Sequence, residues 1–306
     1  MKVLVATEKP FAPVAVEGIK KIIEEAGHEA VLLEKYAGEK ELLDAVATAD
    51  AMIVRSDKVT RRVLETAQQL KIVVRAGAGY DNIDLEAATE RGVVVENTPG
   101  QNSNAVAELV FGMAVWAARN GFDGTSGSEL KDKTLGLHAF GQVGRNVARI
   151  AAGFGMEVSA FDPYCPADVM THAGVKPVEE LEKLYSGNRY VSVHIPATPQ
   201  TRGSIGYDLV SLMPRGGVLI NTARKEVIDE HGLIKALRER PDLKYVADVR
   251  PDAAAEMEEE FGNRVFFTPK KMGAQTAEAN INAGLAAARQ IVAFFKDGDR
   301  RFQVNK

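Results

Sequence analysis

The chain alternates short apolar runs, rich in β-branched residues, with stretches of helical periodicity from its first residues onward. The runs KVLVAT (2–7), AMIV (51–54), KIVV (71–74) and GVVVEN (92–97) are apolar almost throughout rather than at every second position. Strands of this kind are buried on both faces, which is typical of a parallel sheet with helices on either side. The first 98 residues therefore predict one doubly wound α/β domain.

The same alternation starts again after a long apolar helix (103–120) and a segment rich in Gly, Ser and Asp. This second series predicts a second doubly wound domain with a parallel sheet. The last helix of the chain has no strand after it, so it cannot extend the second sheet and can return to the first domain. We therefore predict a discontinuous first domain (1–98 and 280–306), a second domain (99–279) and a cleft between them.

Composition excludes several kinds of partner. The 306 residues are 45% hydrophobic and 26% charged, which is the balance of a globular protein with two domains. The formal net charge is -4 with both signs interspersed, so we expect no nucleic-acid partner. No apolar run approaches the roughly 18 residues of a membrane span, and we predict a cytoplasmic protein with no membrane partner.

Cysteine and histidine usage argues against a metal centre. The single cysteine excludes an internal disulfide and any multi-cysteine metal site. The five histidines are not spaced like a set of metal ligands. We expect no metal.

A glycine-containing turn joins a predicted strand to a predicted helix in the second domain. It reads AFGQVG (139–144) and matches the dinucleotide fingerprint G-x-G-x-x-G except for alanine at the first position. Gly141 lets the backbone approach a pyrophosphate, and Gly144 allows close helix packing. Gln142 and Val143 begin the helix whose N-terminal amides and dipole favour an anion. A strand-to-helix turn without a ligand has a similar sequence, so the context has to decide.

The next predicted strand ends at Asp162, about 20 residues after the fingerprint. A carboxylate at that distance binds the ribose hydroxyls of a dinucleotide. It also repels a 2'-phosphate, so NAD is favoured over NADP as the cofactor. The alternative is a solvated aspartate in a turn.

Several further motifs occur along the chain, and their order is as informative as their content. They are VRSDKVT (54–60), RAGAGYDNIDLEAATERGVVVENTPG (75–100), NAVAELVFGMA (104–114), VSVHIPATPQTRGSIG (191–206), GVLINTARKEVIDE (217–230) and GAQTAEAN (273–280). Together with the fingerprint, they make the whole chain resemble the D-2-hydroxyacid dehydrogenase family, and within it the short-form D-3-phosphoglycerate dehydrogenases. The resemblance implies a flavodoxin-like substrate domain, a Rossmann NAD-binding domain and a homodimer through the helix beginning near Asn104.

The resemblance also implies a substrate site. Arg224, just past a predicted strand, matches the arginine that grips the substrate carboxylate and polarises the C2 carbonyl, a role that suits a planar guanidinium. The alternative is an arginine that caps a surface helix.

A second set of residues matches the family's substrate loops in the first domain. Gly77 and Ala78 would offer backbone amides to the carboxylate, and Arg55 and Ser56 match positions that face the substrate. Arg55, and less surely Lys58, would supply the positive charge that a phosphorylated substrate needs. The alternative for Lys58, which we prefer, is a solvated loop lysine.

The cofactor residues follow in the same way. Asp248 matches the ligand of the nicotinamide carboxamide, and Thr222 and Ala223 match the residues that line the nicotinamide ring. His194 and Pro196 match the adenine side of the pocket. His194 could equally be a packed core histidine.

This sequence departs from the family at the catalytic pair. In most of the family a histidine follows a Thr-Pro pair, and a glutamate follows the Asp-Val pair. Here the last histidine is His231, the Thr-Pro pair (268–269) precedes Lys270 and Lys271, and Ala253 stands where the glutamate would fall. The usual acid/base is therefore absent.

A lysine can replace the pair. Its ordinary pKa of ~10.4, against ~6.5 for histidine, keeps it cationic at neutral pH without a carboxylate. Arg224 nearby and partial desolvation would lower its pKa toward a working range. We predict a lysine acid/base: counting forward from Thr-Pro gives Lys270, which we prefer, and counting back from Gly-Ala gives Lys271. The alternative is a lysine that only binds phosphate, and Asp252 and Glu256 are the candidates for a carboxylate partner.

The function implied is NAD-dependent oxidation of a small molecule, D-3-phosphoglycerate, to 3-phosphohydroxypyruvate at the entry to serine biosynthesis. One alternative is the same chemistry on an unphosphorylated acid, as in glycerate/hydroxypyruvate or glyoxylate reductases. Another is a non-catalytic NAD sensor resembling the C-terminal-binding-protein corepressors. That reading explains the lost histidine and glutamate but not the retained Arg224.

Overall fold

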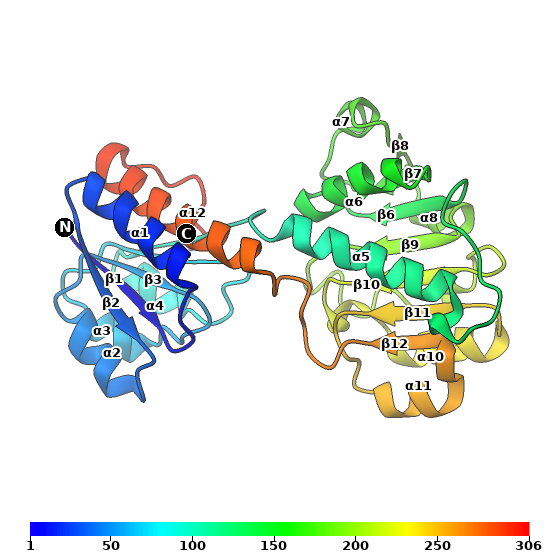
Figure 1. The fold of residues 1–306 in the computed structure, drawn as a ribbon, viewed down its shortest axis with the longest axis horizontal. Coiled ribbons are helices and arrows are strands. Elements are labelled where there is room, and N and C mark those ends of the chain that lie inside the picture. The colour runs from blue at the N-terminus through cyan, green and yellow to red at the C-terminus, as the bar shows by residue number, and fades with distance from the viewer. Residues whose placement is uncertain (306) are drawn as a thin grey trace. The chain divides into compact units, whose positions relative to one another are not determined.

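The structure is a computed structural model that describes residues 1–305. The chain forms two compact units (Figure 1). Unit 1 comprises Met1–Asn102 and the segment from Gln275 onward, and unit 2 comprises Ser103–Ala274. The sequence predicted domain boundaries at 98/99 and 279/280.

Unit 1 is built on a five-stranded sheet whose neighbouring strands are all parallel. The strands are β1 (Lys2–Thr7), β2 (Glu29–Glu34), β3 (Ala51–Val54), β4 (Ile72–Arg75) and β5 (Val94–Asn97). Their order, β2-β1-β3-β4-β5, is that of the flavodoxin-like doubly wound fold. The predicted architecture of the first domain is confirmed.

Helices cover both faces of this sheet. On one face lie α1 (Pro13–Glu25) and α12 (Ala277–Asp297), and on the other lie α2 (Glu39–Val46), α3 (Arg61–Thr66) and α4 (Leu85–Glu90). Helices α1 and α12 pack so closely that a Cβ built at Gly284 would lie only 2.9 Å from Ile19, so glycine is needed at this position. The last helix of the chain thus completes the core on this face of the sheet, where it contacts β3 and β4.

Unit 2 is built on a seven-stranded parallel sheet. Its strands are β6 (Thr134–His138), β7 (Glu157–Phe161), β8 (Lys176–Pro177), β9 (Tyr190–Val193), β10 (Val218–Asn221), β11 (Lys244–Ala247) and β12 (Val265–Phe267). The strand order is β12-β11-β10-β9-β6-β7-β8. Successive strands are added on one side of β6 up to β8 and then, from β9, on its other side, as in the dinucleotide-binding Rossmann fold. The predicted Rossmann architecture is confirmed.

Two layers of helices enclose the unit 2 sheet. The first layer holds α5 (Ser103–Ala118), α6 (Gln142–Gly153) and α7 (Ala167–His172), and the second holds α8 (Leu181–Gly187), α9 (Tyr207–Val210), α10 (Glu230–Glu239) and α11 (Ala254–Phe261). Short 3-10 turns occur at Asn120–Phe122, Lys225–Val227 and Gly262–Arg264. Helix α5 is apolar around most of its circumference because it packs into the core of unit 2 against α6 and the sheet.

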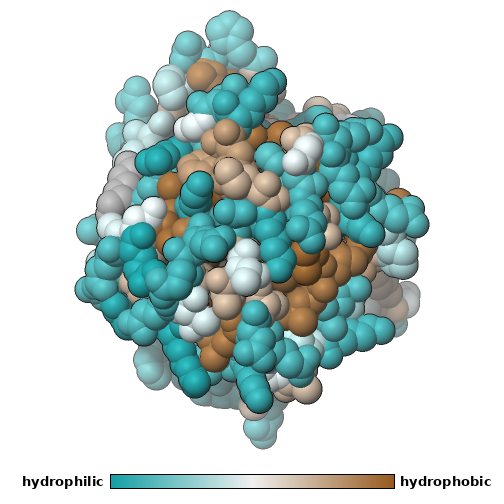
Figure 2. All heavy atoms as spheres, turned by 90° about the vertical axis from the view of Figure 1, so that its left-hand side faces the viewer, coloured by the Kyte–Doolittle hydropathy of each residue, from teal (hydrophilic) through white to brown (hydrophobic). Residues whose placement is uncertain are grey.

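The outer surface is more polar than these cores. Figure 2 shows one face of the molecule, on which hydrophilic side chains predominate and hydrophobic ones form small separate patches. Within residues 1–305, no helix combines the length and apolar character needed to cross a bilayer.

Candidate active site

The fingerprint loop connects β6 to α6 at the carboxyl edge of the unit 2 sheet. A Cβ at Gly144 would lie 2.5 Å from the carbonyl oxygen of Ala139, so only glycine allows this helix to approach the strand so closely. A Cβ at Gly141, which precedes α6, would meet no atom within 4 Å. The N-terminus of α6 therefore faces open space, as a pyrophosphate requires.

Ala139 occupies the first glycine position of the fingerprint and has a φ of +88°. This is a conformation that glycine adopts freely and L-alanine adopts only with strain. The departure from the fingerprint is thus a departure in residue type while the backbone keeps the glycine-like shape.

Asp162 follows β7 directly and lies beside the fingerprint loop. Its Oδ2 accepts a hydrogen bond from the Phe140 N–H at 2.8 Å, and its Oδ1 accepts one from the Tyr164 N–H at 2.9 Å. The second bond is that of an ordinary Asx turn, whereas the first ties the carboxylate to the loop 22 residues away. The structure thus brings Asp162 and the fingerprint together.

His194 follows β9 and lies against β6. Its N–H donates to the His138 carbonyl oxygen at 2.9 Å, while its ring Nε2 is buried without a partner among residues 1–305. Burial, helped by the nearby His138, lowers the pKa of His194 to about 3, and burial lowers the pKa of His138 to about 4. Both rings are neutral at pH 7. Pro196 is exposed two residues further on.

The loop after β10 carries the predicted nicotinamide and carboxylate residues. Asn221, at the end of the strand, brackets this loop: its Nδ2 donates to the Arg224 carbonyl oxygen and its Oδ1 accepts from the Ala223 N–H, both at 2.9 Å. Thr222 is buried, and its hydroxyl has no partner within residues 1–305. The role of Asn221 was missed from the sequence, although an amide side chain at a strand end is a recognisable turn signal.

Asp248 follows β11 and is completely buried. Its Oδ1 accepts hydrogen bonds from the Thr268 hydroxyl at 3.0 Å and the Met272 N–H at 2.8 Å, and its Oδ2 accepts one from the Gly273 N–H at 2.8 Å. A Cβ at Gly273 would lie 2.8 Å from the same Oδ2. The carboxylate therefore holds the segment that follows β12 in place, a function that the sequence did not predict.

The held segment carries the two lysines, and the structure distinguishes them. Lys271 Nζ donates to the Ala223 carbonyl oxygen at 2.7 Å, and Arg224 Nη1 donates to the same oxygen at 3.0 Å. Lys270 is exposed, and its ammonium has no polar partner in the part of the chain that the structure describes. The contacts thus favour Lys271, whereas the sequence count preferred Lys270. Asp248 holds this segment at Gly273. Counting back from Gly273 gives Lys271, which shares the Ala223 oxygen with Arg224.

The two candidate carboxylate partners of the lysine form ion pairs with other residues. Asp252 pairs with Lys225 at 2.5 Å, and Glu256 pairs with Arg238 at 3.1 Å. Ala253, at the family's glutamate position, donates its N–H to Glu230 Oε2 at 2.8 Å. At the position of the family's glutamate, this chain therefore has a backbone N–H that is hydrogen-bonded to Glu230.

In unit 1, Arg55 is held by its own unit. Its Nη1 donates to the carbonyl oxygens of Lys9 and Pro10, and its Nη2 donates to Asn280 Oδ1 at 2.6 Å. Burial lowers the pKa of Arg55. The guanidinium therefore joins an N-terminal loop to the start of α12, while Ser56 and Lys58 are exposed beside it.

The two predicted positions in the loop after β4 differ in whether the backbone N–H is already hydrogen-bonded. The Gly77 N–H donates to the Arg75 carbonyl oxygen at 2.8 Å, and a Cβ at Gly77 would overlap the Arg75 guanidinium. The Ala78 N–H has no partner within residues 1–305, while its carbonyl oxygen accepts from Asn97 Nδ2 at 2.6 Å. Ala78 is thus the residue whose amide is available.

The residues at the carboxyl edge of unit 2 fit a dinucleotide. The open N-terminus of α6 suits a pyrophosphate, and the loop-bound Asp162 suits a ribose. The buried Thr222 hydroxyl and His194 Nε2 lack partners that a cofactor could supply. Within residues 1–305, no group of three or more His, Cys, Asp or Glu side chains could hold a metal ion.

Known proteins resemble this chain over nearly its whole length. The crystal structure of NAD+-bound 3-phosphoglycerate dehydrogenase from Entamoeba histolytica is 49% identical, covers 100% of this chain and 99% of that one, and has a TM-score of 0.87. D-3-phosphoglycerate dehydrogenase from Methanocaldococcus jannaschii is 38% identical over 89% of this chain and 54% of its own length. Hydroxypyruvate reductase from Thermotoga maritima is 33% identical over 86% of this chain and 90% of its own length.

The chain spans about half the length of the first of these curated relatives, the Methanocaldococcus protein. Residues 108–270 match the family model described as "D-isomer specific 2-hydroxyacid dehydrogenase, NAD binding domain". This range contains the fingerprint, Asp162, Arg224, Asp248 and Lys270. With the Rossmann strand order and a cofactor site suited to NAD, the match means that the chain belongs to the family of D-isomer specific 2-hydroxyacid dehydrogenases.

Proposed function

We propose that this protein oxidises D-3-phosphoglycerate to 3-phosphohydroxypyruvate with NAD, using Arg224 to bind and polarise the substrate and Lys271 as the acid/base. The observation that carries this proposal is the convergence of the two cationic groups on the Ala223 carbonyl oxygen. Relatives named D-3-phosphoglycerate dehydrogenase support the choice of substrate. The reaction would serve serine biosynthesis.

Arg224 binds the substrate carboxylate in two-point geometry and directs its remaining positive charge toward the C2 oxygen. Negative charge develops on that oxygen as the hydroxyl proton leaves, or in the reverse reaction as hydride reaches C2, and a fixed guanidinium stabilises this charge without reorganisation. NAD, when bound, supplies the acceptor for the hydride that leaves C2. Asn221 keeps Arg224 in position through the loop backbone.

Lys271 takes the proton of the C2 hydroxyl as the carbonyl forms and returns it in the reverse reaction. In the oxidation direction Lys271 has to be the neutral amine, because only the neutral amine can accept a proton. Asp248 acts through the backbone of Met272 and Gly273, which fixes the distance from Lys271 to Ala223. In this proposal Asp248 is a positioning residue as well as a candidate contact of the nicotinamide carboxamide.

The other predicted residues take supporting roles in the proposal. Gly141 to Gly144 would hold the pyrophosphate and Asp162 the ribose, while Thr222 and Ala223 would line the nicotinamide and His194 and Pro196 the adenine. In unit 1, the Ala78 amide is the candidate carboxylate donor. Lys58 is the candidate phosphate contact, because the Arg55 guanidinium already holds two carbonyl oxygens and an amide.

Steady-state kinetics test the substrate. We expect kcat/KM with NAD to be much higher for D-3-phosphoglycerate than for D-glycerate, and much lower when NADP replaces NAD. The Thermotoga hydroxypyruvate reductase makes D-glycerate with hydroxypyruvate the second candidate pair. Preference for this pair would refute the phosphorylated substrate, and NAD binding without turnover of any 2-hydroxy acid would favour a sensor.

We also propose a homodimer through α5. This helix is mostly buried in unit 2, yet Leu109, Val115 and Trp116 on it remain partly exposed. Apolar side chains on such a helix suit an interface with a second copy. Light scattering of the intact protein would show twice the mass of 33.1 kDa, and a monomer would refute the proposal.

A further inference from the structure

A cavity of about 300 Å³ opens at the amino-terminal edge of the unit 2 sheet. It lies between the end of α5, the segment 126–128 and the residues that lead into β9, β10 and β11. Arg224 and Lys271 follow the carboxyl ends of strands in the same sheet. A four-residue strand spans about 13 Å, so the cavity is separate from the residues of the proposed reaction.

Two cationic side chains line this cavity. Lys244 Nζ donates to the Ala117 carbonyl oxygen at 2.7 Å and to Asn120 Oδ1 at 2.8 Å, which leaves one of its three protons. Burial lowers the pKa of Lys244, Asp123 opposes that effect, and the nearby charge of Arg189 adds to the lowering. The positive charges of Lys244 and Arg189 are thus close enough to repel one another.

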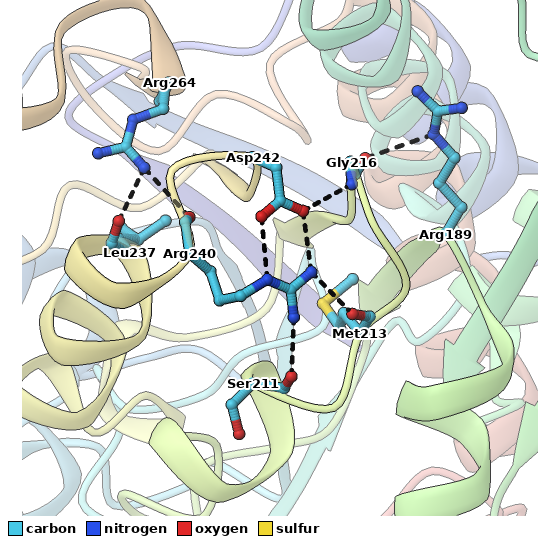
Figure 3. A network of polar contacts seen from close by, with 8 residues as sticks. All are labelled: Arg189, Ser211, Met213, Gly216, Leu237, Arg240, Asp242 and Arg264. Atoms are coloured by element: carbon cyan, nitrogen blue, oxygen red, sulfur yellow. Dashed lines mark hydrogen bonds and ion pairs between the residues drawn. The ribbon is translucent and has the colours of Figure 1, made fainter.

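Arg189 is only partly engaged by the protein. Its Nε donates to the Gly216 carbonyl oxygen at 3.3 Å (Figure 3). Within residues 1–305, its two terminal nitrogens form no hydrogen bond or ion pair. Asp242, the acidic residue of the lining, is already held by Arg240 Nη2 and the Gly216 N–H, each at 2.8 Å. Asp242 therefore does not neutralise Arg189.

The third donor is the hydroxyl of Tyr190, which is 1% exposed and has no hydrogen-bond partner within residues 1–305. The Ser128 side chain lies near it without completing a hydrogen bond of normal geometry. A buried hydroxyl without a partner costs about 1–3 kcal/mol, so such groups normally meet a ligand or an ordered water.

We propose that this cavity binds a small oxyanion, either inorganic phosphate or the phosphate group of a small metabolite. Capping of carbonyl oxygens accounts for two protons of Lys244 and for the Nε of Arg189. It leaves the terminal guanidinium nitrogens and the third ammonium proton at one cavity, whose lining also includes Tyr190 with its buried, unpartnered hydroxyl. Donors around a net positive charge are the chemistry that binds an oxyanion.

The only tryptophan of the chain reports on this cavity. Trp116 precedes the lining residue Ala117 and packs against Phe266 with ring centroids 4.8 Å apart. The intact protein is titrated with inorganic phosphate, and separately with glycerol 1-phosphate, at constant ionic strength. Trp116 fluorescence and the Tm are followed in each titration. We expect saturable changes in both, because a ligand of the folded state raises the Tm.

Single variants locate the binding. Arg189→Gln and Tyr190→Phe should each raise the Kd for phosphate by about tenfold or more, since each removes a hydrogen bond to a charged group. Arg215→Gln removes an exposed charge just before Gly216 and should change the Kd by less than about twofold. In phosphate-free buffer, Tyr190→Phe should not lower the free energy of unfolding, because its hydroxyl has no partner to lose.

Three results would overturn the proposal. One is the absence of any saturable response to either ligand, which would leave ordered water as the only partner of Tyr190. Another is an unchanged Kd in Arg189→Gln and Tyr190→Phe. The last is loss of binding in Arg224→Gln with retention in Arg189→Gln, which would place the anion at the carboxyl edge. Saturation by glycerol 1-phosphate alone would support the site and identify a metabolite as its ligand. None of these results bears on hydride transfer.

Discussion

The two edges of the unit 2 sheet differ in how their charged side chains are paired. At the carboxyl edge, Lys271 and Arg224 share one carbonyl oxygen, and the Thr222 hydroxyl lacks any partner among residues 1–305. At the amino edge, Asp242 and Arg240 satisfy one another and the surrounding turns (Figure 3). Parallel strands place similar loops at both edges, so the difference lies in the side chains. The Arg240–Asp242 pair stabilises the fold, whereas Arg224 and Lys271 at one edge and Arg189 and Tyr190 at the other are the groups proposed to meet ligands.

The largest expected effect concerns Lys271. If it is the acid/base, Lys271→Met should lower kcat by about 10³-fold, because a positioned proton donor typically contributes that much. Lys270→Met is the matched control, with the same change one residue away, and should keep kcat near wild type. Single-turnover measurements at saturating substrate make the comparison. Near-wild-type hydride transfer in both variants would exclude a lysine acid/base.

Asp248 comes next. Asp248→Asn turns one carboxylate oxygen into an amide that faces a donor, so unfolding should become easier by about 2–3 kcal/mol. Displacement of the lysine segment should also lower kcat by about 10²-fold. Asp252→Asn, at an exposed ion pair, is the control and should have little effect on either quantity. A variant that loses affinity for NAD but keeps its stability and kcat would show that Asp248 binds cofactor without positioning Lys271.

The Arg240–Asp242 pair at the amino edge should respond in stability and not in kcat. Arg240 holds the pKa of Asp242 well below its usual value, so the unfolded state binds a proton first as the pH falls. The stabilisation is therefore present above about pH 4 and is lost below it. Asp242→Asn should lower the free energy of unfolding at pH 7 by about 1–2 kcal/mol and remove this acid dependence, leaving kcat unchanged. Denaturant titrations between pH 2 and 7 measure it, and a change in kcat would break the contrast between the edges.

The smallest effect has the opposite sign. Ala139→Gly should relieve the strain of a residue at φ +88° and raise the free energy of unfolding by up to about 1 kcal/mol, after the greater entropy of unfolded glycine is subtracted. Ala148→Gly, inside α6, is the control and should destabilise by about 1 kcal/mol. Equal destabilisation of both variants would mean that Ala139 is not strained.

Much of the fold followed from local pattern. Strands that are apolar throughout indicated two parallel sheets, and the strand orders of both units confirmed the flavodoxin-like and Rossmann predictions. The fingerprint loop and Asp162 also came from spacing, because a strand, a turn and a helix fix the distance between them. These features depend on residues that are close in sequence or repeat with a fixed period.

The details of the site did not follow in the same way. Counting along the chain preferred Lys270, whereas in the structure Lys271 contacts the Ala223 oxygen and Asp248 holds the adjoining Gly273. Arg55 was predicted as a substrate contact, yet its guanidinium reaches Asn280, which is 225 positions away. Such contacts join segments that have no sequence relation to one another.

The sequence by itself determined the two parallel-sheet domains and the dinucleotide fingerprint, and it placed two adjacent lysines after Thr268 and Pro269, because each of these features is a local pattern or motif. Tertiary structure alone decided which lysine meets Arg224, which arginine is held by its own unit and which buried hydroxyls lack partners. The physical reason is that burial and hydrogen bonding depend on how segments meet in space, and that meeting is set by packing of the whole unit.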